Sequence, residues 1–365
     1  MHNNNGDTMP NIKKYNMFIL ISTISRNITE VFSSVLLYKM GYSLRNIFLF
    51  YIILYLVGMI TSTLTINLIK RIKPKYLLII SSIIFGISFY YITNMNNTIS
   101  NLIIFSILFG IGSYIYHTIR HYFALTLINN KKDIGNILIY INIAMIVSTI
   151  LGSFIDKIPK VLLSIIIIII SIIAIIPLFK LNINKEDNKI IIPKIDKNKK
   201  IFFIFEQGKV INISLESLYL FMFIENKISY VGIFNIVLGI SSIIFIYYFV
   251  RRINDKKYFK YLNILFCIFL ILKININSKY LILFIGFFEG LGIKVFDTVS
   301  SFNIYNIKDN TNKLGYILLV EIIFCLTRSI LCLLGYIINN IKIILYITII
   351  LVFITSFIYS KIKKY

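Results

Sequence analysis

Long apolar segments alternate with short polar ones along almost the whole chain. Near-continuous apolar runs of roughly 18–25 residues recur, the length that a helix needs to cross a hydrocarbon core about 30 Å thick. A soluble domain is about half apolar, and its apolar residues are interrupted more often. The pattern therefore predicts an all-α, polytopic membrane protein whose spans are separated by polar loops.

The apolar runs predict twelve transmembrane helices. They cover residues 15–38, 46–69, 76–93, 101–125, 135–155, 161–180, 201–224, 231–249, 258–273, 280–304, 314–338 and 341–360. Residues 1–14 form a polar tail, and the lysine-rich segment 181–200, which contains Pro193, reads as a linker. The chain thus divides into a six-helix half at 15–180 and a second at 201–365.

The two halves also share short sequence matches. Residues 110–122 read GIGSYIYHTIRHY, and residues 290–302, 180 positions later, read GLGIKVFDTVSSF. The start of the eleventh span matches that of the fifth at the same offset, and the basic loops after the second and eighth spans match at 181. A constant offset indicates a tandem duplication. Because six helices is an even number, the two copies enter the membrane in the same direction and form parallel halves.

The charge distribution gives an orientation. The 365-residue chain is 58% hydrophobic and has a formal net charge of +23. Its lysines and arginines concentrate in alternate loops, such as Lys70, Arg71, Lys73 and Lys75. The positive-inside rule then places these loops and both termini in the cytoplasm of a cell membrane. We expect a monomer in the lipid bilayer, and no nucleic-acid partner, because the basic residues follow topology.

Ionisable side chains within the apolar spans are the candidate functional residues. Such groups are costly at membrane depth and usually face a bundle interior or a wet cavity. The candidates for substrate binding or proton coupling are Arg26, Glu30, His117, Arg120, His121, Glu206, Lys209, Glu216, Glu289, Lys294 and Asp297. Glu321 and Arg328, on one face of the eleventh span, are expected to form a structural or gating ion pair.

Several alternatives stay open for these charges. Arg26 and Glu30 are four residues apart and can satisfy each other. His117 and His121 have the spacing of a shared zinc site, but no acid lies near them on that helix, so no metal is expected. The three cysteines lie in apolar spans without metal-ligand spacing, and no cofactor is expected.

The chain resembles the major facilitator superfamily of transporters over nearly its whole length. The resemblance rests on twelve helices in two parallel halves, a central linker and basic loops after the second and eighth helices. In that family the first, fourth, seventh and tenth helices line a central cavity. Here the charges fall on those four spans and the eleventh. The resemblance implies that the loop bearing Lys70, Arg71 and Lys75 helps gating, although this loop lacks the glycines and acid of the family signature.

Together these features predict a secondary active transporter for a small polar or amphiphilic solute, working by alternating access and coupled to protons. Asp297 or Glu289 would carry the proton, while Arg26, Arg120 and Lys294 would hold an anionic or polar substrate. The alternatives are a lipid-linked sugar flippase or a polymerase-type membrane enzyme. An enzyme of that kind needs a large extramembrane loop with catalytic residues, and the longest polar loop here has about twenty residues without such a group.

Overall fold

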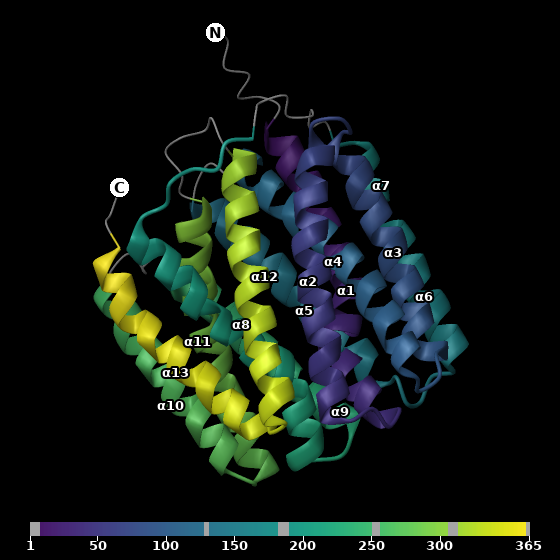
Figure 1. The fold of residues 1–365 in the computed structure, drawn as a ribbon, viewed down its shortest axis with the longest axis vertical. Coiled ribbons are helices and arrows are strands. Elements are labelled where there is room, and N and C mark those ends of the chain that lie inside the picture. The colour runs from purple at the N-terminus through teal and green to yellow at the C-terminus, as the bar shows by residue number, and fades with distance from the viewer. Residues whose placement is uncertain (1–7, 128–130, 182–189, 250–255, 306–312, 363–365) are drawn as a thin grey trace.

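The computed structural model describes residues 8–127, 131–181, 190–249, 256–305 and 313–362, and its only regular elements are helices (Figure 1). They are α1 (Thr8–Lys39), α2 (Leu44–Ile69), α3 (Pro74–Asn94), α4 (Ile99–Leu127), α5 (Lys131–Ser153), α6 (Lys160–Ile173), α7 (Ile176–Phe179), α8 (Lys197–Phe223), α9 (Ile228–Phe249), α10 (Lys256–Asn275), α11 (Lys279–Tyr305), α12 (Lys313–Ile338) and α13 (Ile341–Lys361).

These helices follow the predicted spans to within a few residues, with two differences. Helix α1 begins at Thr8, so half of the predicted polar tail is helical. The sixth predicted span is divided into α6 and α7, because Pro177 lies in the first turn of α7 and cannot continue an α-helical hydrogen-bond ladder. Residues 1–7, 182–189 and 250–255, which include parts of the predicted tail, linker and basic loop, lie outside the described residues.

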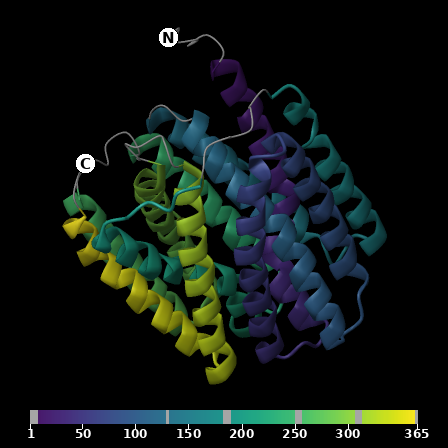
Figure 2. The ribbon, with the colours of Figure 1, turned by 45° about the horizontal axis from the view of Figure 1, so that its top comes forward.

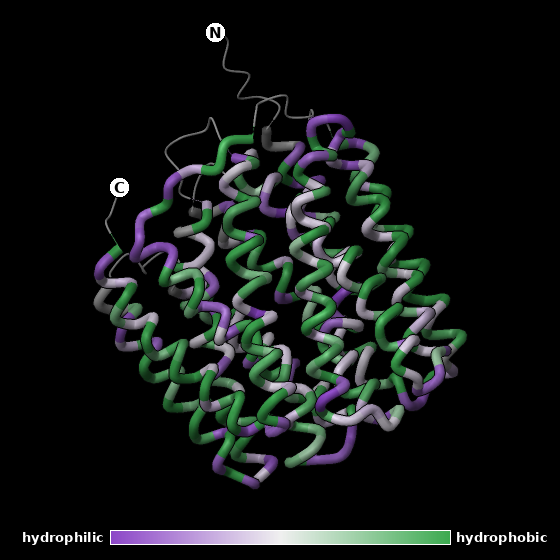
Figure 3. The backbone as a smooth tube through the Cα atoms, viewed as in Figure 1, coloured by the Kyte–Doolittle hydropathy of each residue, from purple (hydrophilic) through white to green (hydrophobic). Residues whose placement is uncertain are grey.

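The outer surface of the bundle is apolar at mid-height. Among the described residues, eight segments are long and apolar enough to cross a membrane, namely α2, α3, α4, residues 135–153, residues 161–179, residues 228–248, α12 and α13. Figure 3 shows apolar residues through the middle of the helices and polar residues gathered at their ends. Large apolar side chains such as Ile172 and Ile330 are more than half exposed on this surface. The chain is therefore a multi-pass membrane protein.

The helices form two groups that meet along the centre of the molecule (Figures 1 and 2). Helices α1–α7 lie on one side, and α8, α10, α11 and α13 lie on the other. Helices α9 and α12 both contact α8 and belong to this second group. They also join it to the first group, because α12 packs along α2 and α9 packs along α5. Helix α1 begins and α13 ends near one end of the bundle, which we call the terminal face (Figure 1).

The first glycine pair of the sequence repeat brings α4 close to two neighbours. A Cβ at Gly110 would lie 3.1 Å from the Leu54 carbonyl oxygen of α2. A Cβ at Gly112 would lie 3.1 Å from Ile84 Cγ2 of α3. A Cβ at either position would fit only if its neighbour moved by a few tenths of an ångström, so the two glycines let α4 pack closely on α2 and α3.

The second glycine pair has equivalent neighbours in the second group. A Cβ at Gly290 would overlap the Leu238 carbonyl oxygen of α9, and one at Gly292 would lie 2.6 Å from the Phe266 ring of α10. Helix α11 thus contacts α9 and α10 through its glycine pair as α4 contacts α2 and α3. The matched sequence segments therefore make matched helix contacts.

Candidate functional site

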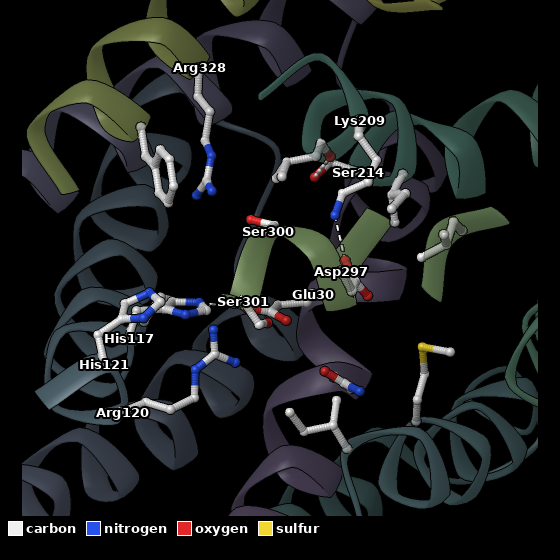
Figure 4. A pocket seen from close by; sticks show the side chains of 18 of the residues that line it. Glu30, His117, Arg120, His121, Lys209, Ser214, Asp297, Ser300, Ser301 and Arg328 are labelled. Carbon is white, nitrogen blue, oxygen red and sulfur yellow. Dashed lines mark hydrogen bonds and ion pairs between the residues drawn. The ribbon is translucent and has the colours of Figure 1, made fainter. Parts of the chain in front are cut away.

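A cavity of about 420 Å³ lies between the two helix groups. It is lined by residues of α1, α2, α4, α5, α8, α9, α11 and α12, and those contributed by α5 are apolar. The charged and histidine residues in its wall are Glu30, His117, Arg120, His121, Glu206, Lys209, Lys294, Asp297, Glu321 and Arg328 (Figure 4). These are all of the candidates that the sequence places inside apolar spans, except Arg26, Glu216 and Glu289.

Arg26 lies behind the cavity wall, between α1 and α4. Its Nε is 3.5 Å from Glu30 Oε1, and its Nη1 is 3.2 Å from His117 Nε2. The guanidinium also lies over the Tyr116 ring, 4.2 Å from the ring centroid. Because an arginine only donates, His117 Nε2 accepts this bond and the ring proton is on Nδ1. The sequence alternative in which Arg26 and Glu30 contact each other is thus present, with His117 as a third member.

Asp297 accepts hydrogen bonds from two lysines at the cavity wall, and Figure 4 shows the one from Lys209. Lys209 of α8 donates to Oδ1, and Lys294, one turn earlier on α11, donates to Oδ2 at 2.6 Å. Both lysine side chains are less than one-tenth exposed. One carboxylate thus balances two buried ammonium groups, and the trio carries one net positive charge.

A second polar contact connects α4 to the other helix group. His121 Nε2 is 3.4 Å from Glu321 Oε1 of α12, slightly longer than a good hydrogen bond. His121 Nδ1 is 2.9 Å from the Tyr305 hydroxyl of α11. A neutral His121–Glu321 pair holds one proton in addition to the N–H of the neutral imidazole. This proton is on either the ring or the carboxyl group. Glu321 does not contact Arg328, so the ion pair expected from the sequence is not formed.

Arg328 reaches into the cavity from α12 and is held by neutral groups. Its Nε donates to Gln207 Oε1 at 2.7 Å, and its Nη1 donates to the Tyr114 hydroxyl at 3.2 Å. The rings of Tyr55 and Phe324 lie 5.6 and 5.4 Å from the guanidinium carbon. No carboxylate of the described residues lies within ion-pair distance of it.

Arg120 enters the same cavity from α4, and its guanidinium has no hydrogen bond or ion pair within the part of the chain that the structure describes. Its Nε is buried without a partner. The nearest aromatic contact is the Tyr116 ring, 5.9 Å from the guanidinium carbon. Figure 4 shows Arg120 and Arg328 pointing into the cavity from opposite sides.

Glu216 and Glu289 lie away from the cavity, in a buried cluster that also contains Lys273. Lys273 Nζ donates to Glu216 Oε1 and, at 2.8 Å, to both oxygens of Glu289. All three side chains are at most 2% exposed. The cluster joins α8, α10 and α11, so the structure places these two predicted site residues inside one helix group.

Lys273 is a charge that the sequence interpretation missed. The ninth predicted span was taken to contain no buried charge, and this was wrong, because Lys273 at its end is 1% exposed. A terminal lysine normally extends to the membrane interface. The available signal was that neither Glu216 nor Glu289 has a lysine or arginine three or four residues away on its own helix. Gln207, Tyr114 and Tyr305 were also missed, because such residues are common in any membrane helix.

The remaining candidates lie at the terminal face. Lys75 Nζ contacts the Phe179 carbonyl oxygen at 3.5 Å, and no ion pair involves Lys70, Arg71 or Lys75 among the described residues. The possible zinc site at His117 and His121 concerns the cavity instead. Among the described residues, no group of three or more His, Cys, Asp or Glu side chains is placed to hold a metal ion.

No family model matches the sequence, and no curated protein sequence matches it. Solved structures do match over nearly the whole chain. A bacterial homologue of the iron transporter ferroportin, in its outward-facing state, is 12% identical, with a TM-score of 0.68 over 96% of this chain and 98% of that one. The human organic anion transporter MFSD10 is 9% identical, with a TM-score of 0.70 over 97% and 99%. At this identity the likeness shows the fold alone. In fold, it confirms the resemblance to the major facilitator superfamily that the sequence predicts.

Proposed function

We propose that this protein is a secondary active transporter that moves a small polar or amphiphilic solute across the cell membrane by alternating access. The observation that carries the proposal is the charged cavity between two helix groups whose outer surface is apolar. Polar groups are retained inside a membrane bundle at high cost, and they mark solute and ion pathways. The two solved neighbours are an iron transporter homologue and an organic anion transporter, so the fold leaves the solute open.

The architecture that we propose is two parallel six-helix halves, at residues 15–180 and 201–365, connected by a cytoplasmic linker. The matched glycine contacts of α4 and α11 support this repeat. The basic loops support cytoplasmic termini. In this orientation the terminal face is the cytoplasmic face.

Proton coupling is assigned to the His121–Glu321 pair rather than to Asp297. Asp297 balances two lysines, and its protonation would leave both ammonium groups without a counter-charge. The His121–Glu321 pair needs one proton to be neutral, and it bridges the two helix groups. Losing or gaining that proton therefore changes the attraction between the groups, which is what coupling requires.

The test removes this contact and measures access to the cavity. Val31, a cavity residue of α1, is replaced by cysteine for labelling with an impermeant thiol reagent. With Glu321→Ala added, we expect faster labelling in inverted vesicles and slower labelling in intact cells. The control is Thr126→Ala, whose hydroxyl bonds only its own helix at Tyr122.

Two outcomes would count against alternating access. Labelling that is unchanged by Glu321→Ala, or that rises from both sides together, contradicts a reciprocal change in exposure. Proton coupling is examined separately by solute flux into vesicles with and without a pH gradient. If the solute accumulates equally without the pH gradient, proton coupling is rejected, while the proposal of a transporter is retained.

A further inference from the structure

Arg120 and Arg328 come from different helix groups and reach the same cavity. Helix α4 lies in the N-terminal group, and α12 contacts it from the C-terminal part of the chain. The two guanidinium groups point into the cavity from opposite sides, with Ser300, His117 and His121 beside the space between them (Figure 4). A guanidinium is always charged and offers a planar set of donors that fits a carboxylate.

The other cations at the cavity each contact a carboxylate. Arg26 contacts Glu30, and Lys209 and Lys294 share Asp297. By contrast, no carboxylate of the described residues lies within 4.0 Å of either Arg120 or Arg328 nitrogens. Among the cavity cations of the described residues, these two arginines are therefore the ones that contact no carboxylate.

Two nearby carboxyl groups do not change this balance. Glu206 and Glu321 are 4% and 2% exposed, and each has an oxygen with no hydrogen-bond partner. Neither lies within 4.0 Å of a lysine or arginine nitrogen in the part of the chain described.

One stretch of the cavity wall is apolar. It is formed by Leu138, Ile141 and Met145 of α5, Leu238 of α9 and Ile293 of α11. A volume of about 420 Å³ falls in the range of pockets for small organic molecules. The cavity thus presents uncompensated positive charge together with an apolar wall.

We propose that the solute is an amphiphilic organic anion, whose carboxylate binds between Arg120 and Arg328 and whose apolar part lies against α5 and α9. The inference rests on the proposed transport function and names the substrate class of the same cavity. Charge-assisted hydrogen bonds donated by both guanidinium groups would hold the carboxylate. Because the arginines belong to different helix groups, the bound anion connects the groups as the cavity closes around it.

The test measures binding to the purified full chain with matched probes. A series of aryl and alkyl carboxylates, led by 4-phenylbutyrate, is compared with the corresponding amides and with succinate, which has no apolar part. We expect carboxylates of the series to raise the unfolding temperature more than their amides or succinate do. Arg120→Gln and Arg328→Gln should each weaken that binding by about tenfold or more.

The control variant is Lys342→Gln, which removes one positive charge from the start of α13, outside the cavity, and should leave binding unchanged. Arg120→Lys keeps the charge without the planar donor set and should bind with intermediate affinity. That variant keeps the test decisive if Arg120→Gln folds poorly.

The proposal is overturned if no carboxylate of the series binds better than its amide, or if Arg120→Gln/Arg328→Gln binds like the wild type. If succinate binds as well as the aryl and alkyl carboxylates, the proposal that an apolar part of the solute lies against α5 and α9 is wrong. Failure here together with reciprocal labelling of Val31→Cys would leave a transporter with a different substrate class. If anions bind but that labelling does not alternate, the transport function fails instead.

Discussion

At the scale of single residues, the central feature of the site is that its charges differ in how they are balanced. Asp297 serves two lysines, whereas Arg120 has no counter-charge among the described residues. Removing the shared carboxylate of a buried cluster leaves unpaired charge, which costs far more than removing a solvated partner. Asp297 is therefore expected to matter for stability as much as for transport.

We expect Asp297→Asn to lower the free energy of unfolding by about 3–5 kcal/mol, because Lys209 and Lys294 lose their only counter-charge. The matched control is Asp156→Asn. Asp156 pairs with Lys39 at 2.6 Å, but both side chains are more than one-third exposed, so the loss should be at most about 1 kcal/mol. Denaturant unfolding of both variants in one detergent measures the difference. Equal, small losses would mean that the lysines find other partners.

At the scale of helices, much of the fold was predictable from the sequence. Apolar run length gave the twelve segments, because a helix must satisfy its backbone polar groups across the whole hydrocarbon core. The positions at which cavity charges occur also followed from the sequence. Which charges contact each other did not, because Glu321 and Arg328 share a helix face and yet contact His121 and Gln207. Such partners depend on helix rotation and packing, which hydropathy does not encode.

The glycine contacts give a prediction at the same scale. A methyl group at Gly290 would overlap the backbone of α9, while one at Gly110 would meet the α2 backbone at 3.1 Å. Backbone atoms cannot move aside as a flexible side chain can. Gly290→Ala should therefore lower the free energy of unfolding by about 1–3 kcal/mol, and Gly110→Ala by less. The comparison is made by thermal unfolding of the two variants. A larger loss for Gly110→Ala would contradict the packing described for α11.

At the scale of the whole molecule, the two helix groups are similar in arrangement and different in content. Glu289 of the buried cluster corresponds to Phe109 at the repeat offset. Phe109 stacks near Phe105 and Phe50, with ring centroids 5.7 and 6.4 Å apart. The repeat in sequence predicted equivalent helices, but not that one group would contain an ionic cluster where the other contains aromatic rings.

That difference has a mechanical consequence. Apolar rings have no charge to expose when they shift, whereas a shift between α8, α10 and α11 would separate the buried charges of the Glu216–Lys273–Glu289 cluster, which is costly. We expect amide hydrogen exchange in bilayers to be slower in α10 and α11 than in α3 and α4, and Lys273→Met to remove the contrast. Uniform exchange across the four helices would contradict this. The C-terminal helices would then act as a stiff frame, and most of the deformation in each transport cycle would fall on the compliant N-terminal helices.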